Sequence, residues 1–558
     1  MAKSASNRKG NRSRRNFGTS KSSKFTETKV TQRWQGDKPH VITNSSSDND
    51  EEWYTHIYPA VDSLASFPYS IPVGTTFDPV YAGEQWTALA TGQVVPGALI
   101  LEVAPTVGIC DSPTAAPNLA AQQLYSLTRK QNSGRVNYDK TDEMMVIMAM
   151  DSAYMLYEQL LRVYRLMGTY STMNRYQPKA IVQALGFEYD MLNRNLADFR
   201  GILDLFAYQL GSINIPDQFS FIRRHSWLFT NVYKDSEDEK AQLYMFRCAG
   251  LYVWTEGEGE SPTYLRYTQM STLFGTQDNV NSLDQVQSAI NKIMQPLLGS
   301  EDVGVISGDI AKAFGDGGMI QIQPVNQYEA LTPVYSAEVL QQIMNATVIE
   351  GALSDMNIET DYSNLKAGPF IIHQPKVTFN NMGWLTTIRK RLINVRHGNV
   401  TPGQNMVFTR LICDFATPSK PIASSTIIPI QTCGTEIVLG MRVVTFGGMS
   451  DADPNPANPV PLTTRVSQDI SENGPSGQFA EADVRYTALL SAFDNHPTVY
   501  VWGISGSGDE STFQYQLQNY FQDLNQYTWI DKSTVKQLND VALLSEFSVK
   551  DFNMTVTR

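Results

Sequence analysis

The sequence predicts an α+β protein in which the helices and most of the strands occupy different parts of the chain. Amphipathic periodicity indicates helices through much of residues 119–230, and alternating segments rich in β-branched and aromatic residues indicate strands through much of 369–447. A strongly basic stretch precedes both regions. With 558 residues, the chain is long enough for two or more domains and a sizeable core.

The first 38 residues are strongly basic, whereas the rest of the chain is acidic. They contain eleven Lys and Arg and two acidic residues, a net charge of +9, whereas the whole chain carries −12, which leaves −21 on residues 39–558. This stretch has too few apolar side chains to form a core, so we expect a mobile arm. Such an arm suits a polyanion, and nucleic acid is the first candidate partner.

The basic side chains of this arm are the candidate binding residues. Because Ser, Asn and Gly separate them, each can meet a phosphate, and we expect the binding to be largely independent of nucleotide sequence. The candidates are Lys3, Arg8, Lys9, Arg12, Arg14, Arg15, Lys21, Lys24, Lys29 and Arg33. Three other interpretations stay open: a solubilising tail, an Arg- and Ser-rich transit peptide, and a nuclear-localisation role for RKGNRSRR.

The segment after the arm predicts a linker and then extended chain. Residues 44–52 (NSSSDNDEE) are polar and acidic, and four prolines between Trp53 and Gly83 argue against a long helix there. Short strands are expected at Gln93–Val95 and Ala98–Val103, separated by Pro96-Gly97.

The most regular part of the sequence predicts a block of helices. Asn118 can cap a helix over 119–130, and Thr141 can cap a second over 142–167. Met144–Met150 is an unbroken apolar run, so the first half of this second helix should be buried on all sides. Further helices are expected after Pro178, over about twenty residues from Asp190, and over 219–230.

The rest of the chain alternates between the two kinds of element. The stretch AQLYMFRCAGLYVW predicts two strands that turn at Ala249-Gly250. Ser282 begins a capping box, and the helix that follows should end near Gln295, before Pro296. Later elements are expected in this order: a helix within 333–355, strands through 369–447, an exposed loop at 451–461, a helix at 481–493, a strand at 498–503 and a helix at 533–547.

The sequence contains no pattern that indicates an ordinary enzyme or a cofactor site. Phosphate-loop, HExxH and GxSxG patterns are absent, and the four cysteines have neither disulfide nor zinc spacing. We interpret Asp151 as a buried, paired structural carboxylate and His225 as a packed or hydrogen-bonded histidine. No run of eighteen apolar residues indicates a membrane span.

The helical block also resembles a known family. The matching features are RKQNSGRVNYD followed by the methionine-rich helix, then MNRYQP, then RRHSW and KAQLYMF, all between residues 96 and 252. In these features the chain resembles picobirnavirus capsid proteins. None of the motifs is catalytic, so the resemblance concerns shape and assembly.

The resemblance implies a coat protein of a small non-enveloped double-stranded RNA virus. Such subunits form interlocked dimers, about sixty per shell, with the basic arm facing the RNA, and the shell has room for a viral polymerase. It implies assembly in the host cytoplasm, and some members cut off their N-terminal segment. The expected division is an arm and linker at 1–52, a helical shell domain at 53–260, a β-rich projecting dimerisation domain at 261–470, and a segment returning to the shell at 471–558. The competing interpretation is a cellular RNA-binding or RNA-chaperone protein that does not assemble.

Overall fold

The structure, a computed structural model, describes most of the chain between Tyr54 and Val549. The described residues are 54–66, 76–77, 93–94, 96–133, 137–169, 177–237, 241–257, 262–276, 278–350, 352–363, 366, 368–380, 390–396, 398–415, 425–446, 457–469, 487–505 and 514–549. The chain divides into two compact units, Met1–Ser70 and Ile71–Arg558. In the first unit the described part contains the short helix α1 (Tyr58–Ala65), so the extended segment predicted there contains two turns of helix with Pro59 in the first turn.

A six-stranded sheet forms the centre of the second unit. Its order is β17 (Ala457–Leu462), β16 (Glu436–Phe446), β3 (Pro96–Pro105), β5 (Leu243–Cys248), β4 (Tyr233–Lys234) and β8 (Val334–Tyr335). β3 lies parallel to β5 and antiparallel to β16. Its residues Ala98–Leu101 are apolar and buried, which shows that both faces of this part of the strand are covered. The strand predicted at 98–103 is therefore confirmed, and it extends to Pro96 and Pro105.

The 28-residue helix α3 (Lys140–Met167) is the longest element of the helical layer. Every residue from Met144 to Met150 is buried, as the sequence predicts. The predicted cap at Thr141 is wrong: Asp139 is the N-cap, and its backbone N–H donates to the Asp142 carboxylate at 3.1 Å. The apolar run therefore begins after a polar first turn that is stabilised by its own acidic side chains.

The other described helices between residues 116 and 344 are shorter than α3. They are α2 (Ala116–Gln131), α4 (Gln177–Ala184), α5 (Tyr189–Arg194), α6 (Leu196–Gly211), α7 (Ser220–Thr230), α8 (Met270–Phe274), α9 (Leu283–Gly299), α10 (Glu301–Phe314) and α11 (Ala337–Met344). Helices α2, α6, α7 and α9 pack directly on α3. The apolar stripe of α6 is buried at Phe199, Leu203, Phe206 and Leu210, as its spacing predicts.

Several helices differ from the prediction. The helix expected from Asp190 is divided at Asn195 into α5 and α6. The predicted capping box at Ser282 is confirmed, but α9 continues through Pro296 for another turn. Asn118 does not cap α2; its amide nitrogen donates to the carbonyl of Ile371 at 2.9 Å, so a tertiary contact replaces the local one. Helix α10 was not predicted, because Gly304 and Gly308 weaken its helical signal.

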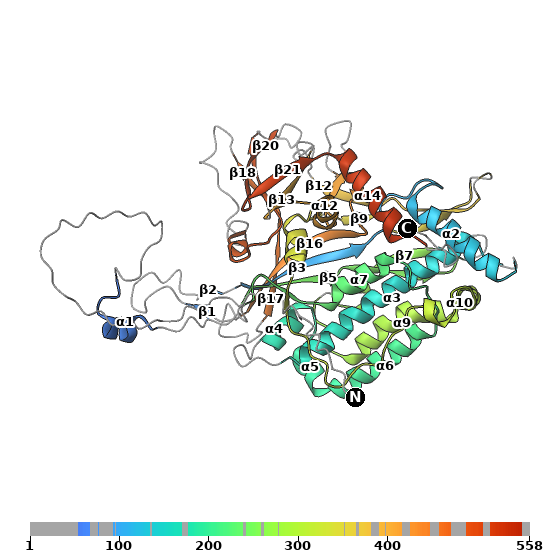
Figure 1. Ribbon diagram of the computed structural model, residues 1–558, viewed down its shortest axis with the longest axis horizontal. Helices are drawn as coiled ribbons and strands as arrows, with labels where there is room; N and C mark the ends of the chain where they lie inside the picture. Colours follow the sequence, from blue (N-terminus) through green and yellow to red (C-terminus); the bar gives the residue numbers. More distant parts are fainter. Residues whose placement is uncertain are drawn as a thin grey trace, which may run out of the picture. The chain divides into compact units, whose positions relative to one another are not determined.

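Smaller sheets and two helices complete the second unit. One sheet contains β9 (Ala352–Ser354), β12 (Lys376–Asn380), β15 (Ser425–Thr432) and β14 (Cys413–Phe415). β10 (Glu359–Asp361) pairs with β11 (Phe370–Ile372), β13 (Arg391–Val395) pairs with β21 (Gln526–Ile530), and β18 (Arg465–Asp469), β19 (Val499–Ser505) and β20 (Gln514–Phe521) form a three-stranded sheet. The two helices are α12 (Pro402–Phe408) and α14 (Lys532–Glu546). Figure 1 shows α3, α6, α9 and α10 on one side of β3 and β5, and β12, β13, β20 and β21 on the other. The mixed α+β class predicted from the sequence is confirmed.

The two strands predicted around Ala249 exist, but they do not form a hairpin. β5 pairs with β3 and β4, whereas β6 (Gly250–Thr255) pairs with β7 (Tyr264–Gln269). Ala249, the residue between the two strands, donates its backbone N–H to the carbonyl of Val103, and the chain passes there from the central sheet to the next one. A Cβ atom at Gly250 would lie 2.4 Å from the Tyr267 ring, so only glycine permits this approach.

The packing of α6 on α3 gives a first testable prediction. Phe206 is fully buried and meets the Tyr157 ring edge-on, with 5.6 Å between ring centroids. We expect Phe206→Ala to lower the free energy of unfolding by about 3–5 kcal/mol, because it removes this contact and leaves a cavity. Urea unfolding of the unassembled protein would measure it. Tyr208→Ala is the control on the same helix, since Tyr208 is 78% exposed and its removal should change stability little.

Candidate functional site

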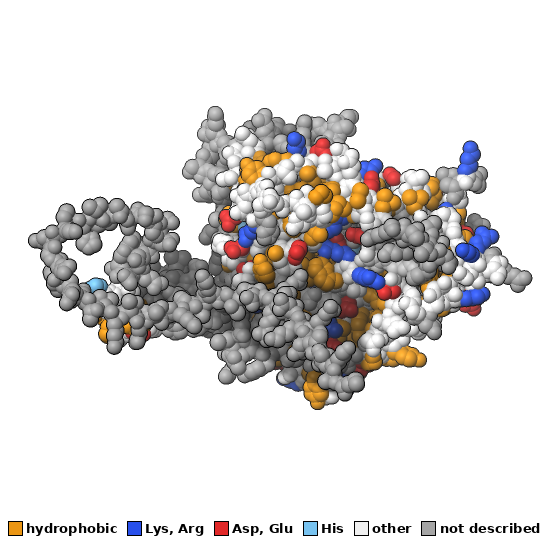
Figure 2. Space-filling model, viewed as in Figure 1, with side chains coloured by type: hydrophobic (Ala, Val, Ile, Leu, Met, Phe, Trp, Pro, Cys, Tyr) orange, Lys and Arg blue, Asp and Glu red, His pale blue; other side chains and the backbone are white. Residues whose placement is uncertain are grey.

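The ten residues predicted to bind RNA, from Lys3 to Arg33, all lie outside the described residues. On the face shown in Figure 2, the described Lys and Arg side chains are interspersed with Asp and Glu and do not gather in one basic patch. The clusters of charged residues that can be described are buried, and they are the places to test for chemistry.

The main buried cluster joins α3, α7 and the beginning of β16. The Nδ1 atom of His225 lies 2.6 Å from a carboxylate oxygen of Asp151, and its Nε2 atom lies 3.0 Å from the Thr435 hydroxyl. The Nε2 atom is also 3.8 Å from the carboxylate of Glu436. All four residues are at most 3% exposed. Asp151 directly follows the apolar run of α3, so the helix carries this carboxylate into the core.

Two carboxylates determine the charge of His225. Burial alone would lower the pKa of this imidazole, but Asp151 and then Glu436 outweigh burial and raise the pKa to about 9. Burial would likewise raise the pKa of Glu436, but Arg224 and His225 hold it below its ordinary value. The cluster therefore contains a protonated histidine between carboxylates at neutral pH.

Thr435, His225 and Asp151 have the connectivity of a hydroxyl, a base and an acid in a nucleophilic triad. A general base must accept the hydroxyl proton, and a histidine with a pKa of about 9 already carries its proton at pH 7. The Thr435 side chain is also buried, at 1% exposure, so no substrate reaches it. The arrangement stabilises the core and does not support catalysis, in agreement with the structural roles predicted for Asp151 and His225.

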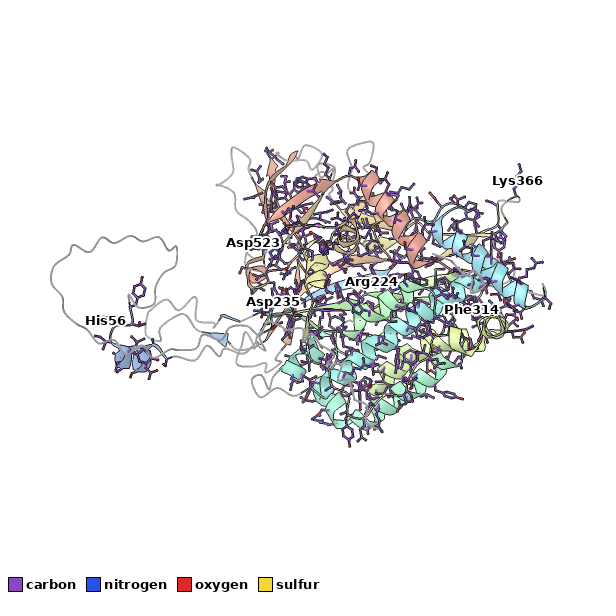
Figure 3. All side chains as sticks on the ribbon, in the orientation of Figure 1. His56, Arg224, Asp235, Phe314, Lys366 and Asp523 are labelled. Atoms are coloured by element: carbon purple, nitrogen blue, oxygen red, sulfur yellow. The ribbon has the colours of Figure 1, made fainter. Side chains whose placement is uncertain are left out.

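Arg224 extends this cluster towards the strand-rich part. Its Nε atom donates to Glu436 at 2.7 Å, and a terminal nitrogen donates to the side-chain oxygen of Gln342 in α11 at 3.0 Å. Figure 3 labels Arg224 where the helices meet the strands. The cluster thus connects segments that are up to 285 residues apart, from Asp151 to Glu436.

A second cluster crosses the central sheet and is internally neutral. Arg247 and Arg442 both donate to Asp278, at 2.6 and 2.8 Å, and Arg442 also donates to Glu102 at 3.0 Å. A Cβ atom at Gly186, where φ is +91°, would lie 2.7 Å from Arg247. Two cations and two anions therefore satisfy one another beside a required glycine, and no charge is left for a ligand.

Glu143 is a third buried carboxyl group, at the contact of α3 with α2. The Thr128 hydroxyl donates to one of its oxygens at 2.6 Å, and the other oxygen has no partner among the described residues. Burial raises the pKa of Glu143 to about 8, despite the bond from Thr128. The group is therefore largely protonated at neutral pH.

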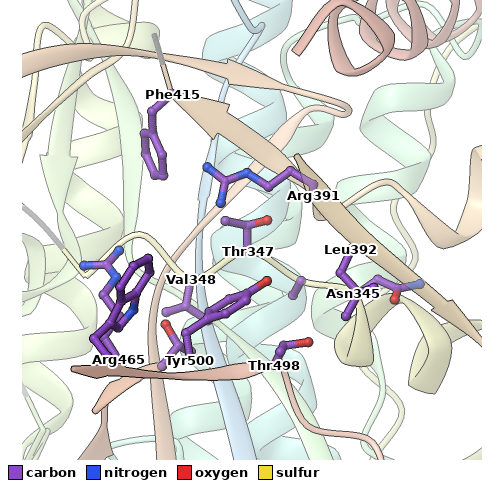
Figure 4. A pocket seen from close by; sticks show the side chains of 12 residues that line it. Asn345, Thr347, Val348, Arg391, Leu392, Phe415, Arg465, Thr498 and Tyr500 are labelled. Carbon is purple, nitrogen blue, oxygen red and sulfur yellow. The ribbon is translucent and has the colours of Figure 1, made fainter. Parts of the chain in front are cut away.

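A cavity of about 40 Å³ lies between the strand-rich elements (Figure 4). Arg391, Arg465 and Tyr500 are among its lining residues. Arg391 is bound to Asp414 at 2.8 Å, and Arg465 lies 3.6 Å from Glu350. The space is large enough for no more than a few water molecules, and both guanidinium groups already face a carboxylate.

The described residues contain no group of three or more His, Cys, Asp or Glu side chains placed to hold a metal ion. All four cysteines are buried and free, and burial raises the pKa of their thiols to about 12. None of the helices in the described ranges is long and apolar enough to cross a membrane.

Comparison with known proteins identifies the family of this fold. The family described as "Picobirnavirus, Capsid protein" matches residues 53–446, well over half of the chain. The chain belongs to the picobirnavirus capsid protein family. The resemblance seen in residues 96–252 is thereby confirmed and extended, and the alternative of a cellular RNA-chaperone is excluded.

Two picobirnavirus proteins show the extent of the similarity. The capsid protein precursor of human picobirnavirus is 24% identical over 528 residues, covering 90% of this chain and 91% of that protein. The X-ray crystallographic structure of the picobirnavirus capsid aligns with a TM-score of 0.73 at 21% identity, covering 90% of this chain and 98% of that one. This chain is therefore a viral capsid protein with a structural role, and it is a component of the virion.

Sequence reasoning found the two ends of the main cluster but not the connection between them. Asp151 was expected to be buried and paired and His225 to be packed or hydrogen-bonded, yet nothing local indicates that they pair with each other. Arg224 and Glu436 were missed. Two signals were available: a charged residue stands next to the histidine in RRHSW, and an acidic residue, Glu436, begins the strand EIVLGMRVVTF. Their pairing depends on the tertiary fold.

The raised pKa of His225 predicts a pH-dependent stability. A group whose pKa rises from 6.5 to about 9 on folding stabilises the protein fully below pH 6.5 and loses this effect as the pH rises through 9. We expect His225→Gln to be less stable than the unmodified protein by an amount on the order of 3 kcal/mol at low pH, with the difference shrinking towards pH 9. Unfolding in urea across this range measures it, and the exposed His56→Gln is the control. A pH-independent difference would contradict the charged pairing.

Glu143 predicts a change of a different kind. Because its pKa is raised from 4.5 to about 8, the carboxyl group costs increasing stability as the pH rises from 4.5 to 8, and the full cost applies above 8. Glu143→Gln should therefore gain stability over the unmodified protein progressively in this window, by urea unfolding. Glu359→Gln, at an exposed position, should show no such trend. A flat difference for Glu143→Gln would mean that the carboxyl group is already ionised in the fold.

Proposed function

We propose that this capsid protein assembles as dimers into a closed icosahedral shell and packages RNA through its basic N-terminal arm. The observation that carries the proposal is the charge asymmetry, +9 on residues 1–38 against −21 on the remainder. The acidic body repels RNA, so attraction is confined to the arm. The shell fold is the setting in which such an arm acts at high copy number.

Confinement explains how an arm without base-reading features is sufficient. Once a shell encloses the RNA, every arm meets the same polymer at high effective concentration, so weak contacts add up. Binding that depends on phosphates has no sequence preference, which suits a coat protein that must cover a whole genome segment.

We also propose the division into arm and linker (1–52), shell domain (53–260), projecting dimerisation domain (261–470) and returning segment (471–558). Stacking of the Phe547 ring on Phe221 of α7, with 4.3 Å between centroids, supports the return of the C-terminal segment to the helical layer. The packing of α9 on α3 and the position of β16 in the central sheet favour narrower limits for the projecting part.

Three further features belong to the same proposal. Assembly takes place in the host cytoplasm, the shell encloses the viral polymerase, and the N-terminal segment is released by a single cleavage of the chain. The name "capsid protein precursor" given to the human picobirnavirus relative supports such processing. Mass spectrometry of purified particles, showing either the full mass or a shortened chain, tests the cleavage.

Removal of the arm provides the decisive test of packaging. Particles from a chain lacking residues 1–38 should contain almost no RNA, measured by the ratio of absorbance at 260 and 280 nm and by extraction. A matched variant in which the ten predicted RNA-binding residues are replaced by Gln keeps the arm length and should behave in the same way. If all nine net charges contact a duplex, the logarithm of the association constant for RNA should fall linearly with the logarithm of the salt concentration, with a slope of about −8. Unchanged RNA content in both variants would refute the role of the arm.

A further inference from the structure

Strand β21 has the properties of a protein contact rather than of an ordinary surface strand. It pairs with β13 on one side, and its other edge faces no strand in the described part of the chain. Residues 526–529 are all exposed, including Tyr527 at 53% and Trp529 at 39%. Tyr527 and Trp529 lie two positions apart, so they share one face of the strand.

Its composition lacks the usual protection of an edge strand. Proteins that stay monomeric place Lys, Pro or a bulge on such an edge, because unpaired N–H and C=O groups invite another chain. The sequence QYTWI has no charged residue and no proline, and its pairing with β13 is regular over five residues. A long-lived free chain with this edge would aggregate, so we expect a specific partner to cover it.

The strand is held rigidly, as an interface strand must be. All five residues of β13 are buried, and Ile393 and Val395 pack in a core with Val535 of α14. The side chain of Asn394 donates to the carbonyl of Asp523 at 2.6 Å, which fixes the chain just before β21. Little conformational entropy is therefore lost when a partner binds.

We propose that β21 pairs with β21 of a second copy, antiparallel across a twofold axis, to form a continuous four-stranded sheet with the two β13 strands. The inference rests on the proposed dimeric assembly and assigns its contact. If the pairing is centred on Thr528, each Tyr527 lies opposite the partner's Trp529, and two aromatic cross-strand pairs form. An antiparallel edge is complementary to itself, so one strand supplies both halves of the interface.

The residues that flank β21 carry mixed charge and do not oppose this arrangement. Asp523 precedes the strand, and Asp531 and Lys532 directly follow it; all three side chains are exposed. Figure 3 labels Asp523 on the strand-rich part. Antiparallel pairing centred on Thr528 brings the Asp523 end of one copy to the Asp531-Lys532 end of the other, where Lys532 offsets one of the two carboxylates.

A disulfide test examines the register directly. In an antiparallel pair the Cα atoms of opposed residues are about 4.5–5.5 Å apart, a separation that a disulfide spans. Particles of the full chain carrying Thr528→Cys should therefore form covalent dimers under mild oxidation, seen on a non-reducing gel. Lys536→Cys, exposed on the adjoining helix α14, is the control and should stay monomeric, because the four native cysteines are buried. Intact particles in which Thr528→Cys gives no more covalent dimer than this control would overturn the proposal.

A second variant measures the contribution of the aromatic pair. Trp529→Asp should weaken dimerisation about 30-fold or more, as loss of a central aromatic contact does, and a cooperative thermal transition of the monomer would show that the variant still folds. Unchanged dimer affinity by analytical ultracentrifugation would refute the pairing. So would protection from hydrogen exchange, in the monomer, of those β21 amides that point away from β13, because it would show that another segment of the same chain covers the outer edge. Failure of the unmodified chain to form particles would instead refute the proposed assembly.

Discussion

The burial of α3 is the constraint on which most of the second unit depends. A helix with apolar residues on every side cannot lie on a surface, so the sheet and the surrounding helices must enclose it. Its polar groups then need partners inside the core. Arg162 donates to the carbonyls of Asn231 and Phe246, and Ser152 and Gln159 accept from backbone N–H groups of Tyr252 and Cys248. These bonds fix the register of the helix against the strands.

The same reasoning explains the Asp151–His225 pair. A lone carboxylate in the core would be costly, and a lone imidazolium equally so. Placing them 2.6 Å apart, with Glu436 and Arg224 beside them, makes each group the partner of another. Removing one partner would leave an uncompensated buried charge, which is more damaging than the pair is stabilising. A buried cluster of this kind favours one arrangement of helices and sheet over its alternatives.

Sequence reasoning succeeded where the signal was local and failed where it was not. The buried run Met144–Met150, the apolar stripe of α6 and the Ser282 capping box depend on residues a few positions apart, and all are confirmed. The supposed hairpin at Ala249 was wrong, because strand pairing depends on which distant segment offers a free edge. The predicted helix cap at Asn118 was wrong for the same reason, because its amide nitrogen donates to the carbonyl of Ile371, which lies 253 residues away. The predicted RNA-binding residues, outside the described ranges, stay a prediction.

Charge also limits where copies of this protein can meet. Even with the arm included, each chain carries −12, so two copies repel one another at long range, and salt screens this repulsion only beyond about 8–10 Å. Contacts between copies are therefore favoured at surfaces without charge, where burial of apolar side chains outweighs the residual repulsion. Strand β21 is such a surface, because QYTWI contains no charged residue. If the arm binds RNA as proposed, one charge balance serves two purposes, because the acidic body also directs contacts between copies to neutral, aromatic edges.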